Sequence, residues 1–189
     1  NKLTHSQWES PSRCHKWAIK DVVSHLVAIN GFFLNSINRA LEGDSLPSHG
    51  MPNPGTGNAM QMSDGIASRA IQMSETTLSR KIDAMEALTF LEDALITTWK
   101  KLDQNQWDMP AYHPVNQLSP NLILELKLME ITIHSWDIFN SIDSKDRCSC
   151  KAKELMIIKK VCYPFMGFTK LTSMTFIKDK NDFFIFEFF

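Results

Sequence analysis

The chain has 189 residues, with 20 Lys and Arg against 21 Asp and Glu and a formal net charge of -1. This length holds one domain of ordinary size and part of another, and it excludes two large domains. The near-balanced charge argues against a surface built mainly for nucleic acid or anionic lipid. Hydrophobic residues make up 43% of the chain, so it can bury a sizeable core and is neither collagenous nor disordered in composition.

Targeting and redox signals are few. The longest charge-free apolar stretch near the C-terminus, residues 161–168, is far shorter than the roughly 20 residues of a membrane-spanning helix. The first ten residues lack both an initiator Met and the apolar core of a signal peptide. We expect a cytoplasmic protein with no membrane or nucleic-acid partner. Its thiols should be reduced, because the spacing of the four cysteines matches neither C-x-x-C nor a dense disulfide framework (Cys14, Cys148, Cys150 and Cys162).

The first predicted helix covers residues 18–41, where apolar residues recur every three or four positions. It should end near Glu42 and Gly43, because residues 44–58 are dense in Gly, Pro, Ser and Asn and predict a loop.

A second helical region should begin near Ser63, and a third helix should include residues 84–102. We expect a break between them near residues 74–77, because Ser and Thr side chains compete for backbone hydrogen bonds and favour helix ends.

A last long helix follows the polar loop of residues 103–118. Ser119 and Pro120 supply an N-cap and a proline at the first helical position, and the pattern continues to about Ser141. Its expected buried stripe consists of Leu122, Leu126, Met129, Ile133 and Trp136.

The C-terminal part differs in composition. Residues 144–150 are polar and predict a linker, residues 152–161 predict a short helix, and residues 172–189 predict a β-hairpin rich in Phe and Ile. An isolated hairpin would expose an aggregation-prone edge, so we expect it to belong to a larger sheet. The sequence thus predicts a bundle in residues 1–145 and the beginning of a second domain in residues 146–189.

A candidate metal site draws on two helices. Glu130 and His134 are four residues apart, so on a helix both side chains project from one face and can bind the same ion. In a four-helix bundle His25 of the first helix could complete a His, Glu, His set, which is a known catalytic zinc shell with one open position. The alternative is a solvated Glu130 beside a partly buried His134, with His25 an ordinary core histidine.

Competing chemistries lack their motifs. The sequence contains no H-E-x-x-H, which excludes the common metalloprotease signature, and no helix carries the Glu-x-x-His of a di-iron bundle. It also lacks G-x-S-x-G, P-loop and G-x-G-x-x-G patterns, so nothing indicates the nucleophile turn of a hydrolase or a nucleotide-binding loop.

The remaining histidines fall in terminal or loop segments, where solvated side chains are usual: His5, His15, His49 and His113. His15 and His113 are fallback ligands if His25 faces away from the other two.

Two carboxylates stand one helical turn from the candidate histidines. Asp21 could hold the second nitrogen of His25, and Asp137 could hold that of His134. Asp21 fits equally well as an ordinary carboxylate in the first turn of its helix. Trp17 needs no role beyond that of a large apolar anchor.

Two segments carry a family resemblance: WESPSRCHKWAIKDVVSHL at residues 8–26 and LMEITIHSWDI at residues 128–138. Together they resemble the metal-binding domain of the mycothiol-dependent maleylpyruvate isomerase family, in the DinB-like superfamily. That family has a tryptophan, a helix start ending in His-Leu, and Glu-x-x-x-His-x-Trp-Asp on the fourth helix. The resemblance covers about residues 5–143.

The resemblance implies a mainly α fold, an up-down-down-up four-helix bundle with a long crossover, followed by a small α/β domain. It also implies a divalent metal, with zinc favoured, held by His25, Glu130 and His134. The implied partners are a low-molecular-weight thiol, mycothiol or an equivalent, and a small electrophilic substrate. We expect a monomer or a homodimer.

Four departures from the family pattern stand out. Lys16 replaces a glycine before the tryptophan, and Ala18 replaces the Thr or Ser that would cap the first helix. The FNSIDS segment after the second motif lacks the small residues common there. The resemblance also implies a C-terminal domain that contributes a catalytic arginine in the isomerases, and we expect residues 146–189 to form only its beginning, so the catalytic residues stay unassigned.

These observations predict a zinc-dependent enzyme that uses a small thiol. Bound to the metal, the thiol would lose its proton near neutral pH and act as the nucleophile of a cis-trans isomerase or of a thiol transferase. The alternative is a noncatalytic metal-binding bundle that acts as a sensor or partner-binding module.

Overall fold

The computed structural model describes residues 3–14, 16–56, 58–142, 177–178 and 184–185, and this part is mainly helical. Its elements are α1 (His5–Trp8), α2 (Ile19–Leu41), α3 (Ala59–Glu75), α4 (Lys81–Lys101), the short 3-10 helix η1 (Gln106–Asp108), α5 (Pro120–Ile142), β1 (Ile177–Lys178) and β2 (Phe184–Ile185).

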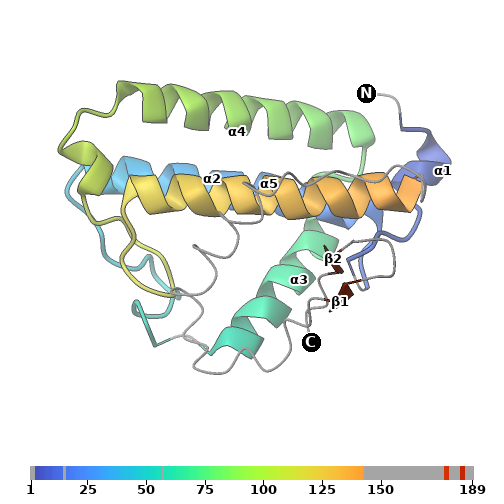
Figure 1. Ribbon diagram of the computed structural model, residues 1–189, viewed down its shortest axis with the longest axis horizontal. Coiled ribbons are helices and arrows are strands. Elements are labelled where there is room, and N and C mark those ends of the chain that lie inside the picture. The colour runs from blue at the N-terminus through green and yellow to red at the C-terminus, as the bar shows by residue number, and fades with distance from the viewer. Residues whose placement is uncertain (1–2, 15, 57, 143–176, 179–183, 186–189) are drawn as a thin grey trace.

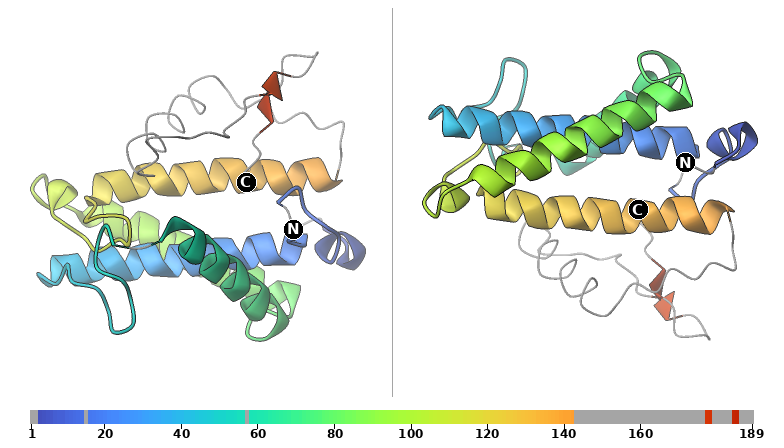
Figure 2. Two further views of the ribbon diagram at one scale, coloured as in Figure 1. Left: turned by 90° about the horizontal axis from the view of Figure 1, so that it is seen from below. Right: turned by 90° about the horizontal axis from the view of Figure 1, so that it is seen from above.

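The helices surround α2. Figure 1 shows α2 and α5 side by side, with α4 along one face of the pair, and Figure 2 shows α3 crossing the opposite face obliquely. Helix α2 contacts α3, α4 and α5. Side chains that α2 and α5 direct toward one another therefore lie inside the bundle.

The order of helix directions differs from the one that the resemblance implies. Only residues 76–80 join α3 to α4, and the four long helices alternate in direction along the chain (Figure 1). Five extended residues reach at most about 18 Å, whereas a helix of the length of α4 spans roughly 30 Å, so this link cannot be a long crossover. The long connections are instead residues 42–58 and 102–119.

Local signals set the ends of α2 and α5 as predicted. Gly43 has a positive φ of 81° just past the end of α2. The N–H of Asp44 donates to the carbonyl of Arg39 at 2.8 Å, which completes a glycine-based helix stop. Helix α5 begins at Pro120, directly after the predicted N-cap Ser119.

The break between α3 and α4 is confirmed, but α3 begins earlier than predicted. It starts at Ala59 because the side chain of Asn58 accepts the N–H groups of Met60 and Gln61 at 3.0 and 3.1 Å. The sequence argument weighed the loop composition here and overlooked this cap.

Two hydrophobic clusters flank the middle of α2. Toward its C-terminal end, Phe33 packs with Leu95 and Trp99 of α4, and toward its beginning, Val23 packs with Trp8 of α1. These clusters fix α2 at both ends, and the polar residues of its middle lie between them.

The buried face of α5 is not the predicted one. The expected apolar stripe is only half-buried, and the most buried residues are Pro120, Ile123, Lys127, His134 and Asp137. This polar face can be buried because its charged groups have partners inside the bundle.

Several predictions lie outside the described residues: the linker at 144–150, the helix at 152–161, the fallback ligand His15 and three of the cysteines. Within the predicted hairpin, β1 and β2 pair antiparallel, with Ile177 opposite Ile185 and Lys178 opposite Phe184. None of the helices in the described ranges has the length and apolar character needed to cross a membrane.

A strained turn precedes α2. Lys16 is exposed and has a positive φ of 69°, the conformation that glycine adopts without steric cost. Ala18 is the N-cap of α2 and offers no side-chain acceptor; its own N–H donates to the Asp21 carboxylate at 2.8 Å. The two departures noted in the sequence thus have local consequences: Lys16 takes a left-handed backbone conformation, and α2 has no side-chain hydrogen bond from its N-cap Ala18.

We expect Lys16→Gly to raise the free energy of unfolding by about 0.5–1 kcal/mol, because glycine relieves the left-handed strain. Urea unfolding of the metal-free protein measures the change. Arg13→Gly, at an exposed position of the same segment, is the control and should not stabilise the protein. A Lys16→Gly variant no more stable than the parent would contradict the assignment of strain to this turn.

Candidate metal centre

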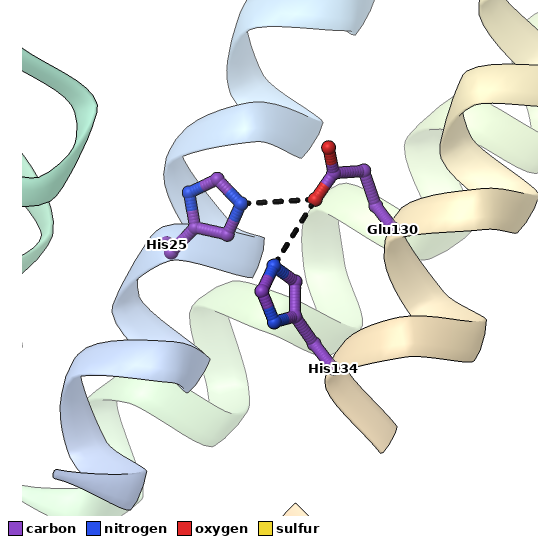
Figure 3. A group of neighbouring side chains, drawn as sticks. All are labelled: His25, Glu130 and His134. Carbon is purple, nitrogen blue, oxygen red and sulfur yellow. Dashed lines mark hydrogen bonds and ion pairs between the residues drawn. The ribbon is translucent and has the colours of Figure 1, made fainter. Parts of the chain in front are cut away.

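Three side chains from α2 and α5 meet inside the bundle. His25 projects from α2, and Glu130 and His134 project from successive turns of α5 toward it (Figure 3). Glu130 Oε2 lies 3.0 Å from His25 Nε2 and 3.2 Å from His134 Nε2. The three ligand atoms all lie within 4.8 Å of one another. Residues more than a hundred positions apart thus form one compact cluster.

The geometry and chemistry of this cluster fit a divalent metal ion. Zinc binds imidazole nitrogen and carboxylate oxygen at about 2.0–2.2 Å, so the ligand atoms of a tetrahedral site are about 3.3 Å apart. The two distances from Glu130 Oε2 to the histidine nitrogens, 3.0 and 3.2 Å, are close to this value, and all three ligand atoms lie within 4.8 Å of one another. Three donors leave one position of a tetrahedral ion open.

Asp137 holds the far side of one imidazole. Its Oδ2 lies 2.8 Å from His134 Nδ1, so Nδ1 carries the donated hydrogen. This hydrogen bond directs Nε2 toward Glu130 and fixes the plane of the ring. The predicted partnership of Asp137 with His134 has the geometry of a carboxylate that orients a ligating histidine.

Asp21 has other partners. Among the described residues, its carboxylate accepts from the N–H of Ala18 at 2.8 Å and from the hydroxyl of Ser74 on α3. It therefore caps α2 and joins α2 to α3. The second expectation for this residue, a carboxylate in the first helical turn, describes its position better than a partnership with His25 does.

Burial and pairing together set the charges of the cluster. Burial opposes ionisation of Glu130, but hydrogen bonds and charges from His134 and His25 outweigh it and hold the pKa of this carboxyl well below its usual value. Burial likewise opposes the charged form of His134, yet its bonds to Asp137 and Glu130 raise its pKa from 6.5 to about 9. Without a metal, the cluster therefore contains an ionised Glu130 carboxylate within hydrogen-bond distance of the imidazoles of His25 and His134.

A comparison with known families identifies the fold around this site. The sequence model of the mycothiol maleylpyruvate isomerase N-terminal domain matches residues 1–139, well over half of the chain. The chain belongs to this family. The matched region contains His25, Glu130 and His134. No curated protein and no solved structure matches the chain.

The other histidines in the described part of the chain, His5, His49 and His113, are not members of the cluster. His5 and His49 are exposed. His113 lies on the α4–α5 connection, where its Nδ1 accepts the N–H of Val115 at 3.2 Å and its ring meets that of Phe32. Burial lowers the pKa of His113 to about 4, against the opposing charge of Glu130. His113 is therefore a neutral neighbour of the cluster and not one of its three members.

A second polar group lies beside the cluster and was not predicted. Lys127, one turn before Glu130 on α5, is 2% exposed and pairs with Glu92 of α4 at 2.8 Å. Asn30 of α2 donates to the same Glu92 oxygen at 3.0 Å. Burial lowers the pKa of Lys127, and Glu92 opposes this shift. The sequence shows that Lys127 lies one helical turn before Glu130. It does not show the partners of Lys127 and Glu92, because these come from different helices.

We expect Asp137→Asn to lower the pKa of His134 by at least about one unit in the metal-free protein, because the variant loses an anionic partner. Since the folded pKa is raised from 6.5 to about 9, the stabilisation from this pairing is complete below pH 6.5 and is lost as the pH rises through 9. Asp137→Asn should therefore destabilise the protein by about 2 kcal/mol at pH 6 and by less above pH 9.

Imidazole NMR titration and urea unfolding at several pH values measure these effects. Asp64→Asn removes an exposed carboxylate of α3 and is the control. An unchanged His134 titration in Asp137→Asn would show that the pairing does not set the charge of this ring.

Proposed function

We propose that this protein is a zinc-dependent enzyme that uses a low-molecular-weight thiol. The observation that carries the proposal is the convergence of His25, Glu130 and His134 in a chain of the mycothiol maleylpyruvate isomerase family. The three side chains would hold the ion, and Asp137 would orient His134 toward it.

The donor set suits activation of a thiol. Two neutral imidazoles and one carboxylate leave a bound divalent ion with a net charge of +1, and zinc in such a site binds a thiol at its open position and lowers the thiol pKa. Glu130 contributes the only negative charge among the three donors. Because the side chains of His25 and His134 are 7% and 11% exposed, water screens these charges weakly.

The family description favours isomerisation of an activated double bond. In such a reaction the thiol sulfur adds to one carbon, the resulting single bond rotates, and the thiol leaves unchanged. If the sulfur stays attached to an electrophile, the result is a thiol transferase. Both reactions need a small electrophilic substrate and the same nucleophile. A noncatalytic metal-binding module would share the metal site and lack this turnover.

The first test is metal content. We expect about one zinc per chain in protein purified without added metal, and at least about a hundredfold weaker zinc binding in His25→Ala and in His134→Ala, because each loses a ligand. Mass spectrometry of the metal and a competing chelator measure both. His49→Gln and His113→Gln should keep the parental affinity. Full zinc retention by His134→Ala would refute the ligand assignment.

The second test is thiol-dependent turnover. Mycothiol and other small thiols would be assayed with maleylpyruvate and with simple alkylating electrophiles. We expect turnover that needs both thiol and metal and falls about 100-fold or more in His25→Ala. Circular dichroism checks that the variant remains helical. A zinc-loaded protein with no thiol-dependent turnover would instead favour the noncatalytic module.

A further inference from the structure

We infer that Trp17 is a positioning residue of the metal centre, whose indole holds both imidazoles in their ligating orientation and stabilises them when they bind a cation. The inference rests on the proposed metal site and adds to it a residue from the segment before α2. In the sequence, this tryptophan had no role beyond apolar packing.

The indole of Trp17 contacts both imidazoles. Its ring centroid lies 5.2 Å from that of His25, with the planes tilted by 42°, and 6.0 Å from that of His134, with a tilt of 38°. The two imidazoles lie 4.9 Å apart and nearly perpendicular, at 77°. Three aromatic rings therefore pack together, and neither imidazole can turn without moving against the indole.

The π-electrons of the indole make this packing more favourable when the imidazoles bind a cation. An aromatic face attracts positive charge within about 6 Å of its centroid, and tryptophan does so more strongly than phenylalanine. An imidazole that donates its lone pair to a divalent cation becomes electron-poor. Trp17 therefore stabilises the metal-bound rings more than neutral free rings, which couples its presence to metal affinity and not only to folding.

The backbone around Trp17 is fixed in an unusual way. The N–H of Trp17 donates to the carbonyl of Cys14 at 3.1 Å, and its carbonyl accepts the N–H of Ser12 at 2.8 Å. Lys16 carries the positive φ of 69° within this turn, and its side chain is exposed. Strain of this kind persists where the surrounding structure needs a particular geometry. Here the turn places the indole against the two imidazoles.

A purely structural role is the alternative, because Trp17 also packs against Val22 and Ala70. The chain offers a matched control in Trp99, which is 7% exposed like Trp17 but belongs to the cluster around Phe33 and Leu95. Substitution of either tryptophan removes a buried indole. Only the Trp17 substitution removes a ring that contacts the imidazoles.

The experiment compares zinc affinity and metal-free stability in Trp17→Phe, Trp17→Leu, Trp99→Leu and the parent, using a chromophoric chelator and urea unfolding. We expect Trp17→Leu to weaken zinc binding about 10- to 100-fold and Trp17→Phe to weaken it less, since a phenyl face retains part of the attraction. Trp99→Leu should destabilise the protein and bind zinc within about threefold of the parent. Parental affinity in Trp17→Leu, or an equal loss in Trp99→Leu, overturns the inference.

A surface substitution tests the same idea without removing a buried ring. Lys16→Val removes no buried side chain but disfavours the left-handed backbone, because valine is β-branched. We expect it to weaken zinc binding several-fold, and Lys16→Gly to keep the parental affinity. Equal affinity in the valine and glycine variants contradicts the role of the turn. A parent that binds no zinc sinks the proposed metal site as well, whereas zinc binding that is indifferent to Trp17 sinks this inference alone.

Discussion

The structure depends most on the interaction of one carboxylate, that of Glu130, with two histidines at once. One oxygen of this carboxylate lies within hydrogen-bond distance of His25 on α2 and of His134 on α5, so one anion joins two helices far apart in sequence. A partly buried carboxylate is stabilised by such partners, and the buried imidazoles need a hydrogen-bond acceptor, which the carboxylate supplies. The cluster therefore constrains the register of α5 against α2 and supplies the donors of the candidate metal site with the same three side chains.

Burial of a polar α5 face follows from this constraint. Once Glu130 and His134 face α2, residues one turn away on the same face are buried with them, and each needs a partner. Asp137 pairs with His134, and Lys127 reaches Glu92 on α4. The apolar stripe that the sequence favoured is left half-buried. The hydrophobic clusters at the two ends of α2 offset the desolvation of this polar layer.

The sequence predicted features that depend on neighbouring residues of the chain, such as helix ends. It did not predict which side chains from different helices would become partners. Pro120 and Gly43 each determine a helix end through their own backbone preferences, so both ends were predictable. The spacing of Glu130 and His134 limited the candidate ligands, the geometry of a four-helix bundle added His25, and the family resemblance implied the same three residues. The oblique packing of α3 and the preference of Asp21 for Ser74 depend on which helices become neighbours, and no local pattern encodes that.

The three side chains of the cluster differ in their exposure to solvent. The side chains of His25 and His134 are 7% and 11% exposed, whereas that of Glu130 is 19% exposed. The indole of Trp17 packs against both imidazoles, and the carboxylate is the most exposed of the three side chains. An open coordination position is useful only on the side that a small molecule can reach. The cluster thus combines two imidazoles that pack against an aromatic ring with a carboxylate that keeps the largest exposed fraction of the three.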